Sequence, residues 1–195
     1  MKKISFFLII LIGISASSFA QTTSSRKFSW GYKIGLNGSN IRIENGENSD
    51  WKTGLVTGLF LNFKTSDKMS LQPELLYSSM GGRQVFEPNS SSLRLNYFSI
   101  PLLVKYRASN KLSIVGGPQI DMLIQAKSKN SNSQFAKLTD DFNESSFNLT
   151  AGAEYMPWKC LGFTLRYIYG LSNIAEDGAM EMKNQGVQLT TAIKF

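Results

Sequence analysis

The chain contains no histidine and only one cysteine among its 195 residues. Without histidine, a Ser-His-Asp or Cys-His catalytic arrangement and a His-based metal site are excluded. Because Cys160 is the single thiol, an intramolecular disulfide and a cysteine-based metal site are excluded too. The Gly-x-Ser-x-Gly elbow of many hydrolases is also absent. These absences argue against an enzyme and indicate neither a cofactor nor a metal centre.

Long apolar runs are scarce, and the longest lies at the beginning of the chain. A basic start precedes the apolar run 4–14, and small residues follow it, with Ala20 at the −1 position of a cleavage site. A run this short cannot span a bilayer as a helix, which needs about 20 residues. We therefore predict that residues 1–20 are a cleaved signal peptide and that the protein is exported.

The rest of the chain has no apolar run long enough for a transmembrane helix. A helical membrane protein is therefore excluded, whereas a transmembrane β-barrel is not, because its strands alternate between apolar and polar residues. The formal charge of +7 is not accompanied by a basic helix or an aromatic stacking motif. The sequence therefore gives no indication of nucleic-acid binding.

After a polar lead at residues 21–28, apolar and polar residues alternate with the period of two that is typical of β-strands. The clearest example is the final segment, where Val187, Leu189, Ile193 and Phe195 fall on one side. The segments have about the length that crosses a bilayer when strands are tilted. The eight predicted strands are 30–37, 51–63, 70–78, 97–106, 112–122, 147–155, 161–170 and 186–195.

The connections between these segments alternate between short and long. Short ones are expected at 64–68, 108–110 and 156–160, and long polar ones at 38–50, 81–92, 125–144 and 172–185. This pattern is typical of outer-membrane barrels, which have short periplasmic turns and longer external loops. We predict an all-β fold, an eight-stranded antiparallel up-and-down transmembrane β-barrel at residues 29–195.

Two features indicate that the apolar side faces lipid. Glycines concentrate on the polar side, as a narrow eight-stranded barrel needs small residues inside. Aromatic residues on the apolar side cluster at two levels, as in the interfacial girdles of membrane barrels. The predicted girdles comprise Trp30, Phe63, Tyr106, Tyr155, Phe163 and Phe195 at the short-turn level, and Trp51, Tyr77, Phe98, Phe147 and Tyr169 at the long-loop level.

The polar side of the strands carries the only candidate site. The predicted lumen charge cluster is Lys33, Lys52, Glu74, Lys105, Asp121, Glu154, Arg166 and Lys194. Buried charges must pair or face water. The cluster is interpreted as a salt-bridge plug that fills a narrow barrel, and the alternative is a basic passage or pocket for a small anion.

Several segments resemble the PorT-type outer membrane protein β-barrel domain family, whose members are often labelled porin family proteins. The resemblance lies in 70–77 with Gly81 and Gly82, in 96–106, in 116–118 and in 166–171. It covers nearly all of residues 28–195 and implies the fold and an outer-membrane location, but no specific activity. One branch of the family is implicated in a protein-secretion system.

We therefore expect a small integral outer-membrane barrel with a structural or interaction role, with long loops exposed outside the cell. A narrow channel or transporter for small solutes is the first alternative. A soluble periplasmic lipocalin-like carrier with the two faces reversed is the second. The expected partners are the lipid bilayer and the barrel-assembly machinery, which is expected to recognise Phe195 as a C-terminal signal. The sequence does not identify a partner outside the cell.

Overall fold

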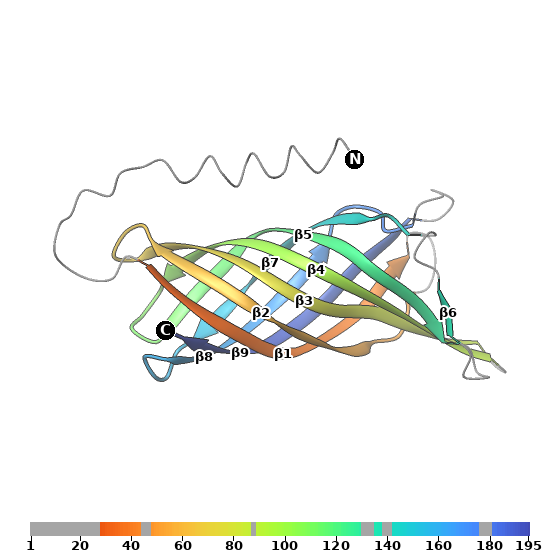
Figure 1. Cartoon of the computed structure of the whole chain (residues 1–195), viewed down its shortest axis with the longest axis horizontal. Helices are drawn as coiled ribbons and strands as arrows, with labels where there is room; N and C mark the ends of the chain where they lie inside the picture. Colours follow the sequence, from red (N-terminus) through yellow and green to blue (C-terminus); the bar gives the residue numbers. More distant parts are fainter. Residues whose placement is uncertain (1–27, 44–47, 87–88, 130–134, 138–141, 176–180) are drawn as a thin grey trace.

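A computed structural model of the chain describes residues 28–43, 48–86, 89–129, 135–137, 142–175 and 181–195 (Figure 1). The predicted signal peptide therefore lies outside the described residues. These residues contain no helix that is long and apolar enough to cross a membrane. They form nine strands: β1 (Phe28–Ile43), β2 (Lys52–Lys64), β3 (Met69–Phe86), β4 (Asn89–Arg107), β5 (Leu112–Lys129), β6 (Phe135–Lys137), β7 (Ser145–Tyr155), β8 (Leu161–Gly170) and β9 (Met182–Lys194).

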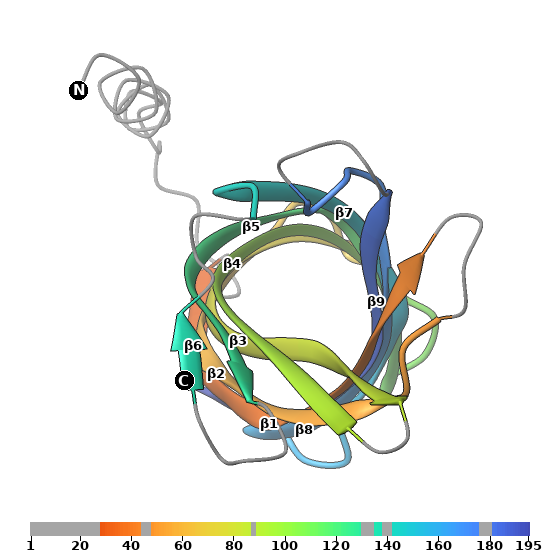
Figure 2. The same cartoon turned by 90° about the vertical axis from the view of Figure 1, so that its right-hand side faces the viewer.

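Eight of these strands close into an antiparallel ring (Figure 2). The order around the ring is β1-β2-β3-β4-β5-β7-β8-β9, and β9 pairs with β1 from Gly31 opposite Lys194 to Ile43 opposite Met182. The short strand β6 pairs with β5 and extends one wall. Closure satisfies the backbone groups that an open sheet would leave at its edges. The predicted eight-stranded antiparallel barrel is thereby confirmed.

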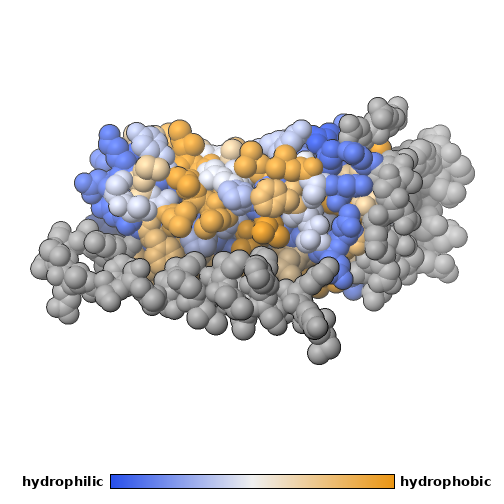
Figure 3. Space-filling view, turned by 90° about the horizontal axis from the view of Figure 1, so that it is seen from above, coloured by the Kyte–Doolittle hydropathy of each residue, from blue (hydrophilic) through white to orange (hydrophobic). Residues whose placement is uncertain are grey.

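The two faces of each strand differ sharply in exposure. Along β8, Leu165 and Tyr167 are exposed on the outside, whereas Thr164 and Arg166 between them are buried inside. The other strands follow the same alternation, so an apolar band surrounds the outside between two hydrophilic ends (Figure 3). A soluble carrier required the apolar faces to point inward, so that alternative is wrong.

The strands continue well beyond the predicted ends at one end of the barrel. β3 and β4 remain paired up to Phe86 opposite Asn89, so most of the predicted loop 81–92 is a β-hairpin. β1 and β5 likewise extend to Ile43 and Lys129. The predicted long connections are therefore shorter than expected, because polar residues continue the pairing. We name this the loop end, and the opposite end, with connections 65–68, 108–111 and 156–160, the short-turn end.

Inward-facing glycines make room for larger side chains in the narrow interior. Gly31 lies opposite Phe60, and a Cβ atom on Gly31 would lie 2.4 Å from the Phe60 ring and 2.2 Å from the carbonyl oxygen of Ile193. The Phe60 ring in turn lies 5.3 Å from the Nζ atom of Lys33, a cation–π distance. The small residue on β1 thus allows an aromatic ring to support a buried charge.

Candidate functional site in the barrel lumen

The eight predicted lumen charges all occupy inward positions, but they lie in separate places along the barrel. Five of them are buried, and Lys52, Lys105 and Lys194 are partly exposed. The structure divides the eight into a central network, a buried carboxylate on β5, a group at the short-turn end and one lysine at the loop end. The buried members are Lys33, Glu74, Asp121, Glu154 and Arg166.

Glu74 on β3 is the centre of the network. Its Oε1 atom accepts hydrogen bonds from Lys33 Nζ at 2.6 Å and from Gln72 Nε2 at 2.8 Å. Its Oε2 atom accepts from Arg166 Nη1 at 2.8 Å. Two cations and one amide thus share one carboxylate with no solvent contact, which compensates for part of the cost of burying the charges.

The ion pair between Glu74 and Arg166 crosses the lumen. β3 and β8 are four strands apart in either direction around the eight-stranded ring, so the two side chains reach from opposite walls. Arg166 Nε also donates to Gln188 Oε1 at 2.5 Å, and Gln188 Nε2 donates to Asn37 Oδ1 at 2.7 Å. Side chains from β1, β3, β8 and β9 therefore form one continuous network across the interior.

Asp121 on β5 forms a second buried group. Its Oδ1 atom accepts from Gln119 Nε2 at 2.9 Å, and its Oδ2 atom accepts from Asn148 Nδ2 at 2.8 Å. Neutral amides thus hold this carboxylate, and none of the described residues forms an ion pair with it at salt-bridge distance.

The charges toward the short-turn end are more accessible. Lys105 on β4 forms an ion pair with Glu154 on β7. Lys194 on β9 is partly buried and interacts electrostatically with both of them and with Arg107. The lumen therefore opens toward water at this end.

The loop end contains a cluster of buried apolar side chains that the sequence interpretation missed. They form the loop-end apolar cluster, which comprises Ile41, Met80, Leu95, Tyr97, Ala126, Phe142, Ile168 and Ile174. The Tyr97 hydroxyl accepts a hydrogen bond from Asn184 Nδ2 at 2.9 Å, so its one polar group is satisfied. Nearby, Lys52 Nζ donates to the Leu93 carbonyl oxygen at 2.7 Å. The available signal was Tyr97, an apolar side chain that lies on the side of its strand opposite the main apolar set.

The predicted girdle aromatics lie on the outer face, where all are at least 40% exposed except Tyr77, which is partly buried. At the short-turn end, the ring centroids of Trp30 and Phe195 lie 4.7 Å apart. At the other level, Tyr77 and Phe98 are direct partners on neighbouring strands. The remaining girdle residues are Phe63, Tyr106, Tyr155 and Phe163 near the short-turn end, and Trp51, Phe147 and Tyr169 near the loop end.

Within the described part of the chain, no three His, Cys, Asp or Glu side chains lie close enough together to bind a metal ion. What the lumen can do follows from its packing. The central network ties opposite walls together, and the loop-end apolar cluster packs inside the barrel toward the loop end.

A closed ring of strands, an apolar outer band and a polar interior define a transmembrane β-barrel. Residues 19–176 match the family model described as "Outer membrane protein beta-barrel domain". The chain belongs to this family and is a protein of the outer membrane. No curated protein sequence shows significant similarity to it.

Solved structures with the same fold include two small barrels. Ail, the attachment invasion locus protein of Yersinia pestis, has a TM-score of 0.57 and 16% identity over 87% of this chain and 100% of that chain. Neisserial surface protein A has a TM-score of 0.58 and 11% identity over 89% of this chain and 100% of that chain. At these identities the likeness concerns the fold alone.

Proposed function

We propose that this outer-membrane protein is a closed barrel with a structural or interaction role and does not conduct solutes. The observation that carries the proposal is the ion pair between Arg166 and Glu74, which reaches across the lumen with both side chains almost fully buried. Toward the loop end, the apolar side chains of the loop-end apolar cluster occupy a further part of the lumen. An eight-stranded barrel has an interior just wide enough for side chains, so these groups fill it.

Single-channel recording in planar bilayers tests this proposal against the narrow channel. The purified barrel should give no steady openings. Steady openings that disappear in Lys33→Gln or Arg166→Gln, and persist in the control Leu165→Ala, would overturn the proposal. Leu165 is a suitable control because it neighbours Arg166 on β8 but points toward lipid.

We further propose that the short-turn end faces the periplasm and the loop end faces the outside, as is usual for such barrels. Cys160 makes the orientation testable, because this single thiol is exposed in the connection between β7 and β8. A membrane-impermeant maleimide should label Cys160 only after the outer membrane is permeabilised. In a Cys160→Ser background, Arg83→Cys at the loop end should be labelled on intact cells. The reverse pattern of labelling contradicts this orientation.

The interaction surface is proposed to be the loop end, with the long connections outside the cell. Support comes from strands β3, β4 and β5. Their backbone pairing continues toward the loop end past the girdle residues Tyr77 and Phe98, so this end projects beyond the aromatic girdle. The absence of catalytic activity is also a proposal, supported by a chain without histidine and by central charges that are bonded to one another.

The closer PorT-type grouping is proposed from segments 70–77 and 96–106, which here form the membrane-spanning parts of β3 and β4. The aromatic girdles are proposed to fix the depth of the barrel in the bilayer. The barrel-assembly machinery is the proposed assembly partner, with Phe195 at the closing seam between β9 and β1, where its backbone N–H donates to Trp30.

A further inference from the structure

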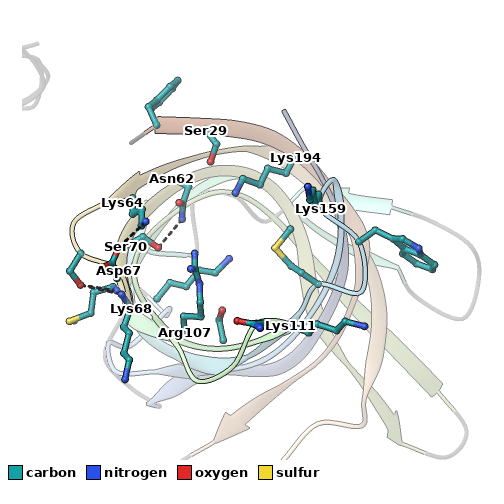
Figure 4. Close-up of a pocket in the computed structure, with 18 of the residues that line it drawn as sticks. Ser29, Asn62, Lys64, Asp67, Lys68, Ser70, Arg107, Lys111, Lys159 and Lys194 are labelled. Carbon is teal, nitrogen blue, oxygen red and sulfur yellow. Dashed lines mark hydrogen bonds and ion pairs between the residues drawn. The ribbon is translucent and has the colours of Figure 1, made fainter. Parts of the chain in front are cut away.

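A cavity of about 810 Å³ lies at the short-turn end of the barrel. It is lined by connections 65–68, 108–111 and 156–160 and by the ends of β1, β4 and β9 (Figure 4). One lining residue, Asn62, donates from Nδ2 to Gln72 Oε1 at 3.2 Å, and Gln72 belongs to the buried network around Glu74. The cavity therefore lies next to this network and opens at the short-turn end of the barrel.

Seven cationic side chains line this chamber, which we name the basic vestibule: Lys64, Lys68, Lys105, Arg107, Lys111, Lys159 and Lys194. In Figure 4, Lys159 and Lys194 lie on one side of the opening, Lys64 and Lys68 on another, and Arg107 and Lys111 on a third.

Few carboxylates offset these cations in the described part of the chain. Asp67 pairs with Lys64 at 3.2 Å, and Glu154 pairs with Lys105. The other five lining cations have no ion-pair partner among the described residues. The vestibule thus carries an excess of positive charge from several separate chain segments.

The inner part of the vestibule has the strongest reason to attract an anion. Lys105 and Lys194 are partly buried. Lys194 is repelled by Lys105 and Arg107, and the attraction of Glu154 is weaker than the repulsion from Lys105. An anion between them would relieve that repulsion. A cleft lined by charge of one sign with low-dielectric walls also concentrates the field at its inner end.

We propose that the basic vestibule binds a small soluble anion with several phosphate-type charges that enters from the short-turn end. Cations from three directions match a ligand with several negative groups, because a single carboxylate would meet only one of them. Lysines suit this task, since each offers a compact ammonium on a flexible stem that can follow a ligand. The site extends the proposed function without requiring conduction, because the lumen beyond it is closed.

Inorganic tripolyphosphate is the probe, and calorimetric titration into the barrel in phosphatidylcholine nanodiscs is the measurement. Saturable binding is expected, with affinity that falls as NaCl rises from about 50 to about 300 mM. Lys194→Gln and Lys105→Gln should each weaken binding about tenfold. The matched control is Lys127→Gln, which removes the same charge at the far end of β5. If either variant fails to fold, Lys111→Gln with Lys159→Gln on the exposed turns replaces it.

Three results would overturn the proposal. The first is the absence of saturable binding at low salt. The second is an equal loss in Lys127→Gln and Lys194→Gln, since that indicates attraction to overall charge and not to the vestibule. The third concerns lipid headgroups as the source of phosphate. In nanodiscs that contain phosphatidylglycerol, Lys194→Gln should weaken tripolyphosphate binding by the same factor as in phosphatidylcholine nanodiscs. If the two proteins bind tripolyphosphate equally there, lipid headgroups have bound to these cationic side chains instead. Conduction, if found, would contradict the closed barrel and leave this test unaffected.

Discussion

Replacing Glu74 by glutamine should destabilise the barrel strongly. Glu74 is buried and accepts hydrogen bonds from Lys33, Gln72 and Arg166. The variant keeps the size of the side chain but leaves two buried cations without a counter-charge. Removing one partner from a buried ion pair typically costs about 3–5 kcal/mol, so we expect a loss of that size in the free energy of unfolding.

Glu154→Gln provides the matched comparison. Glu154 is also inward and buried, but its partner Lys105 opens toward the basic vestibule and keeps 14% of its side chain exposed. Water can therefore solvate the lysine once the carboxylate is gone. The expected loss for this variant is about 1 kcal/mol.

Urea unfolding in phospholipid vesicles, followed by tryptophan fluorescence, measures both variants. Trp30 and Trp51 are exposed on the outer face and should report the transfer from lipid to water. With a slope of about 2 kcal/mol/M, the midpoint should fall by about 2 M for Glu74→Gln and by about 0.5 M for Glu154→Gln. Equal shifts, or a Glu74→Gln barrel within about 1 kcal/mol of the unmodified protein, would refute the reasoning that the central network is desolvated.

Three further changes test the packing, the lipid face and the seam. Gly31→Leu should prevent folding, because its Cβ atom would overlap a backbone oxygen, and the loss of heat-dependent gel migration would show this. Gly38→Ala on the same strand should fold normally, because its Cβ atom would come no closer than 3.6 Å to ring atoms. Leu189→Lys near the middle of the outer band should cost about 2–4 kcal/mol in the same urea assay, and Met69→Lys near the short-turn end about 1 kcal/mol or less. Phe195→Ala should lower the yield of folded barrel in membranes more than Met69→Ala, and equal yields count against a role for Phe195 in assembly.

The alternation of apolar and polar residues predicted the strands, and the inward glycines and two aromatic levels predicted which face points to lipid. The strands β7 and β8 illustrate this, because every second residue from Phe147 to Tyr169 outside the turn faces lipid. The strand ends at the loop end were not predictable in the same way. Beyond the bilayer both faces of a strand can be polar, so Ser90, Ser91 and Ser92 look like a loop although they pair with β3.

Which lumen charges pair with one another could not be predicted from the sequence either. The pattern places Glu74 and Arg166 inward, but they are 92 residues apart and their meeting depends on the stagger of the ring. The loop-end apolar cluster depends on a further irregularity. The register of β4 and β5 shifts between Asn96 and Tyr97, so Ala126 turns inward where strict alternation would place it outside.

The ion pair between Arg166 and Glu74 also depends on closure of the barrel. In a flattened sheet, β3 and β8 would be four strand spacings apart, about 19 Å, far beyond the reach of a salt bridge. The bond therefore exists only when the sheet is rolled up and β9 has met β1. Its free energy favours the closed tube over any laterally opened intermediate, and it resists flattening of the cross-section when the surrounding bilayer presses on the wall.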